Sequence, residues 1–343
     1  MADTIEDLEM DTQEIELETP SSGVFMAPSV WKSDIITGKS YSHYSPIPDA
    51  IEADKGMEVV LGVDEAGRGP VLGPMVYALF YLPIEMHRTL LADTHHFDDS
   101  KVLTAEFRSE LMRKLCTPSS DLHSSCGWAT RLLSARDISA HMLQPAVYNL
   151  NAQAMDATID LIKEVLARGV NVKEIYIDTI GKPEIYQKKL ERIWPTINIT
   201  VAKKADSLYP VVSAASVCAK VTRDAALDVC YEPYQDATSQ EGTGGKKETV
   251  AWGSGYPSDV RTTTWLKANI DPVFGWGPEC RFSWGTAKEL LEVKNSDVRV
   301  DWPVEEDGND MRMTDFFGSK GESAGDELVD WFGRRVTDEM ECF

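Results

Sequence analysis

The sequence predicts an α/β fold, with a mixed β-sheet flanked by helices and a smaller helical part towards the C-terminus. Two observations favour this class. Short apolar runs typical of buried strands alternate with helical segments over roughly 230 residues. The 343 residues are 43% hydrophobic and 26% charged, the composition of a globular protein large enough to bury a sizeable core.

The first predicted elements are a hairpin followed by a helix. Residues 59–63 have the length and apolar content of a buried strand, and residues 73–82 are the expected partner strand across a turn rich in Gly and Pro. Phe107, Leu111 and Leu115 then recur every four residues, which predicts a helix with one apolar face.

The elements after residue 127 alternate in the same way. Gly169 is placed to end a long helix, because glycine adopts the left-handed conformation of a helix C-terminus without strain. Pro183 stands at the start of another helix, where its missing N–H is not needed, and Pro195 ends that helix. The expected strands are 127–133, 173–178 and 197–201, and the expected helices are 149–168, 183–194, 210–230 and 285–293.

Both ends of the chain are strongly acidic. Residues 1–24 carry eight acidic and no basic side chains, and residues 292–343 carry fifteen acidic against six basic ones. The two ends thus hold −8 and −9 of the formal charge of −22, which leaves −5 for the body of the protein. A nearly neutral body can present a local basic groove, so the total charge does not exclude a nucleic-acid substrate.

Composition also divides the chain into domains. We expect a disordered acidic extension over residues 1–55 and a folded domain over 56–293, interrupted by a polar, turn-rich mobile insertion at 235–250. Residues 294–343 are expected to form an acidic, mostly disordered tail.

Cysteine spacing and hydropathy indicate the compartment. The six cysteines are scattered, with no C-x-x-C pair, so neither a zinc site nor a disulfide framework is predicted and a reducing compartment fits best. The most apolar stretch, residues 71–82, is about half as long as a membrane-spanning helix, and the N-terminus lacks the basic region of a signal peptide.

Carboxylates follow three of the predicted strands. Asp64 and Glu65 come directly after the first strand, Asp178 ends a later one, and Asp206 lies just past the next. Because loops at strand ends converge on one rim of an α/β sheet, these side chains can meet there. Four oxygen donors without His or Cys suit Mg²⁺ or Mn²⁺, and two such ions about 4 Å apart can drive phosphodiester hydrolysis. Taken singly, each acid is more simply a helix cap or a partner of lysine.

The residues around these acids resemble a known family. Residues 64–70, which read Asp-Glu-Ala-Gly-Arg-Gly-Pro, resemble the signature of the type 2 ribonucleases H, the ribonuclease HII family. Further matching motifs occur in the family's order: Asp99-Ser100-Lys101, Tyr176-Ile177-Asp178-Thr179, Lys204-Ala205-Asp206, Tyr209 to Ser216, and Gly253-Ser254-Gly255-Tyr256-Pro257. The resemblance covers roughly residues 57–292, and its longer elements are more similar to the eukaryotic catalytic A subunits than to bacterial single-chain enzymes.

This resemblance implies a ribonuclease H-like fold and an endoribonuclease. The implied activity is cleavage of the RNA strand of RNA/DNA hybrids and of the 5′ side of single ribonucleotides in duplex DNA, in the service of replication and repair. The implied chemistry is two-metal-ion hydrolysis that leaves 3′-OH and 5′-phosphate ends. By the same resemblance, Asp64, Glu65, Asp178 and Asp206 are the catalytic residues and bind two Mg²⁺ or Mn²⁺ ions.

The resemblance also implies a set of substrate contacts. Gly67 and Gly69 would let the backbone approach a sugar closely, and with Arg68 they would contact the 2′-OH that distinguishes RNA from DNA. Tyr256 would stack on the neighbouring deoxyribose, although a Gly-Tyr-Pro turn on its own is more often an ordinary surface turn. Lys101 would contact a phosphate. Further candidates for a cationic groove are Lys203, Lys204, Lys220, Arg223 and Arg281.

Partners and location follow from the resemblance as well. It implies a heterotrimer with the family's B and C subunits, and nuclear localisation. Residues 310–317 weakly resemble the peptide by which replication enzymes bind the sliding clamp, through Met313, Phe316 and Phe317, except that Asp310 stands where Gln is usual. The simpler alternative is an apolar patch that contacts partner subunits.

Two other classes of function compete with this one. A non-catalytic binding protein of the same assembly would keep the fold but has no reason to keep all four acids together. A transposase- or resolvase-like nuclease also uses clustered acids, but it needs neither Gly67-Arg68-Gly69 nor Tyr256. Both features therefore favour the ribonuclease.

Overall fold

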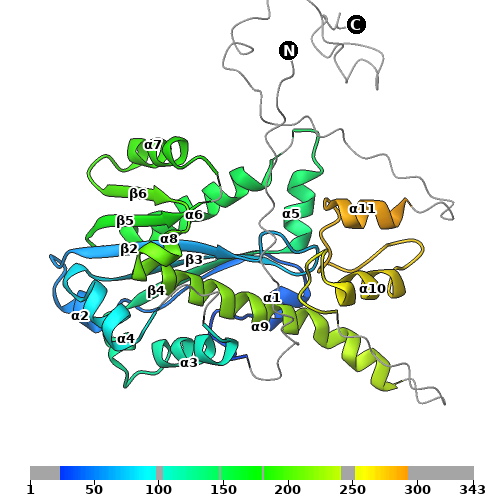
Figure 1. The fold of residues 1–343 in the computed structure, drawn as a ribbon, viewed down its shortest axis with the longest axis horizontal. Helices are drawn as coiled ribbons and strands as arrows, with labels where there is room; N and C mark the ends of the chain where they lie inside the picture. The colour runs from blue at the N-terminus through cyan, green and yellow to red at the C-terminus, as the bar shows by residue number, and fades with distance from the viewer. Residues whose placement is uncertain (1–23, 98–102, 147, 180, 241–251, 293–343) are drawn as a thin grey trace, which may run out of the picture. The chain divides into compact units, whose positions relative to one another are not determined.

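A six-stranded sheet lies at the centre of the protein (Figure 1). The structure is a computed structural model, and it describes residues 24–97, 103–146, 148–179, 181–240 and 252–292. In spatial order the strands are β1 (Tyr41–Tyr44), β4 (Gly127–Leu133), β3 (Met75–Pro83), β2 (Val59–Ala66), β5 (Val172–Asp178) and β6 (Asn198–Ala202). β2, β5 and β6 run parallel, and the other neighbours are antiparallel. The predicted mixed sheet is confirmed.

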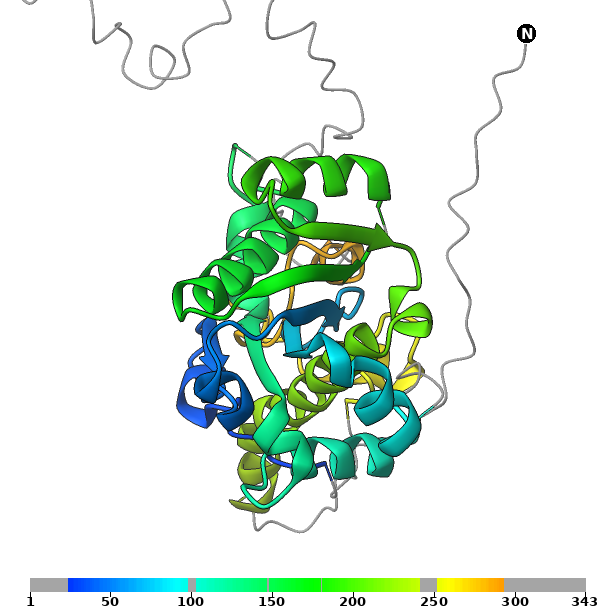
Figure 2. The ribbon, with the colours of Figure 1, turned by 90° about the vertical axis from the view of Figure 1, so that its left-hand side faces the viewer.

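Helices cover both faces of this sheet (Figures 1 and 2). One face packs against α6 (Leu150–Ala167) and α7 (Pro183–Ile193), and the other against α3 (Ala105–Leu115) and α9 (Pro210–Gln240). β2 is apolar on both faces: Val60 points into the α9 side, and Val59, Leu61 and Val63 point into the α6 side. The near-continuous apolar run that predicted a buried strand is therefore a strand between two cores.

Gly62 explains how closely α9 approaches the middle of the sheet. A Cβ atom at this position would lie 2.5 Å from the carbonyl of Val211, which is far inside van der Waals contact. The helix can rest directly on the strand only because the residue there is glycine. This close packing fixes the first turns of α9 beside the end of β2.

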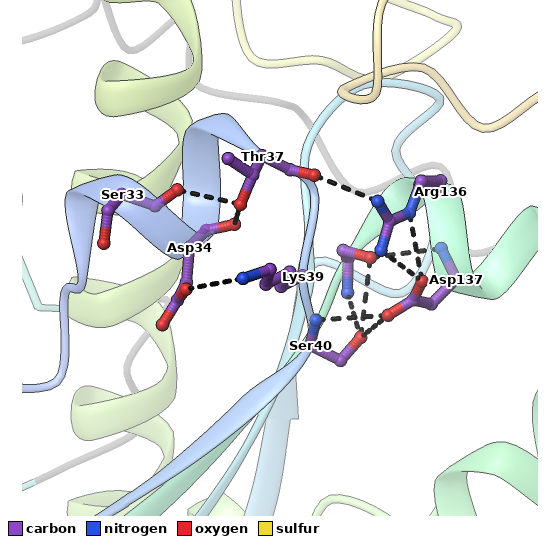
Figure 3. Close-up of polar contacts among 8 residues, drawn as sticks. Ser33, Asp34, Thr37, Lys39, Ser40, Arg136 and Asp137 are labelled. Carbon is purple, nitrogen blue, oxygen red and sulfur yellow. Dashed lines mark hydrogen bonds and ion pairs between the residues drawn. The ribbon is translucent and has the colours of Figure 1, made fainter.

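The N-terminal segment differs from the prediction of disorder up to residue 55. Residues 24–55 form α1 (Lys32–Ile36), the edge strand β1 and α2 (Asp49–Ala53). The Ser40 hydroxyl donates to Asp137 Oδ2 at 2.6 Å, and Arg136 Nη1 donates to the carbonyl of Thr37 at 3.0 Å (Figure 3). These contacts tie the start of β1 to α5 (Ala135–Met142) across almost a hundred residues. Local composition gives no sign of such long-range contacts, so the prediction was wrong for this stretch. Residues 1–23 lie outside the described residues.

The predicted insertion at 235–250 is wrong in its first part, because α9 continues to Gln240. A helix that has already formed gains one hydrogen bond for each further residue, so polar residues can extend it without apolar contacts. Residues 241–251 and the tail from residue 293 onward lie outside the described residues.

The remaining elements complete the expected smaller helical part. α10 (Val260–Ala268) and α11 (Gly285–Leu291) pack with the later turns of α9 around Trp252, Trp265 and Trp276. Trp252 is 1% exposed and stacks edge-on against Trp265, so it belongs to this core rather than to a substrate surface. The other helices are α4 (Asp121–Ser125), α8 (Ala205–Leu208), the 3₁₀ turn η1 (Ile84–Met86) and the π turn η2 (Thr89–Thr94). Among the described residues, no helix has both the length and the apolar character to cross a membrane.

Candidate active site

The acidic residues predicted from strand ends lie at one edge of the sheet. Asp64 and Glu65 stand near the end of β2, and Asp178 ends the neighbouring parallel strand β5. Val63 and Ile177 are register partners, so Asp64 and Asp178 are the next residues along two adjacent strands. β6 pairs with β5 up to Ala202, and the chain then enters α8 with Asp206. We call these four residues (Asp64, Glu65, Asp178 and Asp206) the acidic rim.

A tight turn after β6 places Asp206. Lys204 has a left-handed backbone, with φ of 56°, and so reverses the chain between strand and helix. The N–H of Ala205, the first residue of α8, donates to Asp178 Oδ1 at 2.7 Å. Asp178 therefore fastens the start of the helix that carries Asp206, which is itself 6% exposed.

The carboxylates of the acidic rim interact electrostatically. Burial raises the pKa of Asp64 well above its ordinary value, and the charges of Glu65, Asp178 and Asp206 raise it further. A hydrogen bond from the Ser216 side chain, on α9, opposes part of this shift. Four acids from three separate segments thus act on one another, and the region gains stability from any cation that joins them.

The glycines after β2 bring the chain close to its neighbours. Gly67 has φ of +78°, and a Cβ there would lie 2.7 Å from the carbonyl oxygen of Pro74. At Gly69 a Cβ would lie 3.2 Å from the ring of Tyr256. Hence Tyr256 rests against the segment Gly67-Arg68-Gly69, which we call the glycine loop, although almost 190 residues separate them in sequence.

The turn that carries Tyr256 is fastened on two sides. The N–H of Val71 donates to the carbonyl of Gly255 at 2.8 Å, which joins the turn to the chain just after the glycine loop. The N–H of Gly255 donates to Thr262 Oγ1 at 3.1 Å, which joins it to α10. The backbone just before Tyr256 is therefore held on both sides, by the chain after the glycine loop and by a side chain of α10.

A buried arginine binds the glycine loop from the protein interior. Arg281 is 0% exposed; its Nη2 donates to the carbonyl of Gly67 at 2.6 Å, its Nη1 to that of Arg68 at 2.8 Å, and its Nε to that of Gly73 at 3.1 Å. Its guanidinium also lies 4.7 Å from the ring centroid of Trp284, whose Nε1 donates to the carbonyl of Gly69 at 2.9 Å. Burial lowers the pKa of Arg281 to about 9, so the side chain stays charged at pH 7.

The family model described as Ribonuclease HII matches residues 61–287, a range that contains the whole acidic rim, the glycine loop and Arg281. The chain belongs to the ribonuclease HII family.

Curated relatives agree with this assignment. The chain is 55% identical to the A subunit of ribonuclease H2 from Neurospora crassa over 328 residues, which cover 94% of this chain and 98% of the relative. It is 42% identical to the A subunit of ribonuclease H2 from Homo sapiens over 285 residues, covering 82% of this chain and 88% of the relative. The protein is therefore a ribonuclease H, a nuclease that hydrolyses RNA paired with DNA.

Solved structures of ribonucleases HII share the fold. The ribonuclease H2 of Pyrococcus horikoshii OT3 is 27% identical, with a TM-score of 0.53, over 68% of this chain and 97% of that chain. A structure described as the PCNA:RNase HII complex from Archaeoglobus fulgidus is 25% identical, with a TM-score of 0.54, over 70% of this chain and 100% of that chain. The expected ribonuclease H-like fold is confirmed.

Two of the expected groove cations serve a different purpose in this ribonuclease HII. Arg281 and Arg223 are 0% and 3% exposed, and Arg223 donates from Nη2 to the carbonyl of Ser254 at 2.7 Å. Both guanidinium groups bind backbone and cannot reach a phosphate, so the prediction was wrong for them. Sequence reasoning missed this structural role of Arg281 and Trp284, because the only signal was their place in a matching motif.

The other predicted contacts divide into two groups. Lys203 and Lys204 are exposed beside the acidic rim, and Lys220 pairs with Asp224 at 3.5 Å. Lys101 and the tail residues Met313, Phe316 and Phe317 lie outside the described residues.

The donor chemistry of the acidic rim fits hard divalent cations, since all four side chains offer carboxylate oxygens. Within the described parts of the chain, however, no three His, Cys, Asp or Glu side chains form a closed set that could hold a metal ion as they stand. The fit therefore rests on the chemistry of the donors.

Proposed function

We propose that this ribonuclease HII cleaves both the RNA strand of RNA/DNA hybrids and the 5′ side of single ribonucleotides in duplex DNA, leaving 3′-OH and 5′-phosphate ends. One observation carries the proposal: Tyr256 packs against Gly69, and the loop containing Gly69 begins two residues after Glu65 of the acidic rim. The Tyr256 ring would contact one sugar and the glycine loop the next. The loop in turn lies next to Glu65 in the chain, so the three parts are neighbours.

In this proposal the acidic rim is the catalytic centre. Asp64, Glu65, Asp178 and Asp206 would hold two Mg²⁺ or Mn²⁺ ions, which when bound supply an activated water and stabilise the departing 3′-oxygen. The residues themselves provide negative charge at a fixed place: Asp178 is oriented by the N–H of Ala205, and Asp64 is desolvated beneath α9. Removal of divalent ions should therefore abolish cleavage.

The glycine loop would select ribose. Arg281 and Trp284 bind the carbonyls of all three loop residues, so the loop's peptide planes are fixed and can meet the 2′-OH without reorganisation. The guanidinium of Arg68 would join this contact, Tyr256 would stack on the adjacent deoxyribose, and Lys101 would bind a phosphate.

Partners and location are proposed from the relatives. Those relatives are named as A subunits of ribonuclease H2, which supports assembly with B and C subunits as a heterotrimer, and their eukaryotic origin supports work in the nucleus. The Archaeoglobus structure contains PCNA, which supports a sliding-clamp contact through Met313, Phe316 and Phe317. Deletion of residues 310–318 should weaken clamp binding, and unchanged binding would end that part of the proposal.

The decisive experiment uses a DNA duplex with one embedded ribonucleotide. The full-length chain, alone and with its B and C subunits, is incubated with the duplex in Mg²⁺ or in EDTA, and the products are mapped. We expect a single nick on the 5′ side of the ribonucleotide that requires Mg²⁺. Cleavage of uniform hybrid alone, or cleavage in EDTA, would contradict the proposal.

A further inference from the structure

Tyr77 is a buried tyrosine that lies opposite Glu65 in the sheet. The two residues are register partners in the antiparallel pair of β2 and β3, so their side chains share one face of the sheet. Tyr77 is 4% exposed, and its ring belongs to the core cluster on the α6 side. The ring is an ordinary core group, but a buried hydroxyl costs free energy unless it is hydrogen-bonded.

The hydroxyl of Tyr77 is bonded to the arginine of the glycine loop. Nη1 of Arg68 donates to the Tyr77 hydroxyl oxygen at 3.4 Å. The second terminal nitrogen, Nη2, donates to Oδ1 of Asn151 near the start of α6. The guanidinium is thus held at two points by a strand and a helix, and two contacts fix the orientation of a planar group that one contact would leave free to turn.

The phenol keeps its proton in this position. Burial raises the pKa of Tyr77 well above its ordinary value, the charge of Glu65 raises it further, and Arg68 lowers it in part. Tyr77, Glu65 and Arg68 are therefore within electrostatic reach of one another, although they come from β3, from the end of β2 and from the glycine loop. A neutral phenol at this junction can accept from the arginine without competing for its charge.

We propose that Tyr77 is a positioning residue for Arg68: its hydroxyl holds the guanidinium in one orientation beside the acidic rim, and so supports the preference for ribose without contacting the substrate. This inference rests on the role proposed above for Arg68 at the 2′-OH. It assigns a task to a core residue of β3 that the motifs around the acids do not include.

The same strand provides a matched control. Tyr81 lies four residues further along β3, on the same face, and is 2% exposed. Its hydroxyl lies against Gly127 of β4 and is not a partner of Arg68, which bonds to Tyr77 and Asn151. Replacing either tyrosine by phenylalanine removes one oxygen atom from the same core, but only Tyr77→Phe removes a contact with Arg68.

The test measures cleavage of a duplex with one ribonucleotide by the full-length chain assembled with its partner subunits. Tyr77→Phe should lower kcat/KM about tenfold, the factor expected for one hydrogen bond to a charged group, whereas Tyr81→Phe should leave it unchanged. In an Arg68→Ala background, Tyr77→Phe should have no further effect, because the group that it positions is absent. Affinity for the same duplex made entirely of DNA, measured in EDTA, should not change.

Three results would overturn the inference. These are wild-type kcat/KM in Tyr77→Phe, an effect that adds fully to that of Arg68→Ala, or an equal loss of affinity for the all-DNA duplex. The last two would show a purely structural role, which the melting temperatures of Tyr77→Phe and Tyr81→Phe would confirm independently. If the wild-type assembly fails to cleave the single-ribonucleotide duplex, the proposed function fails first, and that outcome is visible without any variant.

Discussion

The glycine loop begins two residues after Glu65 of the acidic rim, yet the electrostatics of the rim and the contacts of the loop are of opposite kinds. In the rim, burial raises the pKa of Asp64, and the like charges of Glu65, Asp178 and Asp206 raise it further. In the glycine loop the backbone carbonyls are hydrogen-bonded: Arg281 and Trp284 donate to them, and Tyr256 packs against Gly69. The difference teaches that burial and like charges disfavour the ionised form of Asp64 in one region, whereas hydrogen bonds from distant side chains hold the backbone of the other.

The largest expected effect is a loss of cleavage activity when one carboxylate of the acidic rim is replaced and the fold is kept. Asp178→Asn keeps an oxygen that can accept from the N–H of Ala205 but removes one negative charge. We expect cleavage to fall about a thousandfold or more, because a ligand for divalent ions is lost, while the melting temperature stays equal or rises as repulsion is relieved. Asp160→Asn, at an exposed position of α6, is the control. Retained activity in Asp178→Asn would contradict the mechanism.

The next largest effect is expected when Arg281, which binds the carbonyls of the glycine loop, is replaced. Arg281→Lys keeps the charge but lacks the planar fork that reaches three carbonyls, so we expect a loss of about 2–4 kcal/mol in the free energy of unfolding together with reduced cleavage. Chemical denaturation measures the first and initial rates the second. The exposed Arg192→Lys should change neither. A fully active and stable Arg281→Lys would show that the loop does not need this support.

Substitutions at Gly67 and Gly169 distinguish the cost of backbone strain from the cost of close packing. Gly67 and Gly169 both have positive φ, but a Cβ would strike Pro74 at Gly67 and would meet nothing within 4 Å at Gly169. Gly169→Ala should therefore cost about 1 kcal/mol of stability, and Gly67→Ala about 1–3 kcal/mol more, with a loss of activity only in the latter. Equal costs in denaturant titrations would mean that the loop can shift freely.

Tyr256→Ala sharpens the comparison on the substrate side. The lost contact between ring and sugar is worth about 1–2 kcal/mol, part of what full burial of an aromatic side chain contributes, and its loss should mainly slow cleavage at an isolated ribonucleotide, where the neighbouring sugar is a deoxyribose. Rates on the single-ribonucleotide duplex and on a uniform RNA/DNA hybrid are compared under the same conditions. An equal loss on both substrates would argue against a junction-reading role.

The smallest effect concerns α9, which connects the two regions through Ser216 and Arg223. Nε2 of His87 accepts from the N–H of Val211 in the first turn of this helix at 3.2 Å, which requires a neutral imidazole. Burial lowers the pKa of His87 below the ordinary 6.5, and Arg88 lowers it further. Above pH 6.5 the histidine is neutral in both states and the stability is complete; below it the unfolded chain takes up the proton first, so stability falls.

His87→Gln tests this pH dependence, since glutamine accepts a hydrogen bond without titrating. Between pH 7.5 and 5.5 the variant should lose less stability than the wild type. The difference should be about 1 kcal/mol or less in the free energy of unfolding, measured as a smaller drop in melting temperature. The drop should not vanish, because burial also lowers the pKa of His43. An unchanged slope would show that His87 does not control the pH dependence at the start of α9.

The position of the acidic rim could be predicted because each acid is marked by the residues next to it in sequence. Asp64 and Asp178 each follow an apolar run, and the rule that parallel strands end at one edge places them together without any coordinates. The motif around Gly67 and Gly69 predicts a close approach of the backbone to a sugar, which stays a prediction; the structure adds that Gly67 also lies close to Pro74 within the protein.

What supports the loop was not predictable in the same way. Arg281 binds a carbonyl 208 positions away, and β1 is fastened by Asp137 across 97 positions. A surface arginine that binds phosphate and a buried arginine that binds carbonyls look the same in sequence, because burial depends on how distant segments pack. Composition predicts disorder up to residue 55 for the same reason, because the apolar residues of 24–55 are buried only by packing against distant elements such as α9 and β4.

The most direct test of the catalytic centre is anomalous diffraction from crystals of the full assembly grown with Mn²⁺ and a duplex containing one ribonucleotide. We predict manganese between the carboxylates of Asp64, Glu65, Asp178 and Asp206, with the ribose 2′-OH against the glycine loop. Manganese bound elsewhere, or a duplex seated away from that loop, would contradict the mechanism.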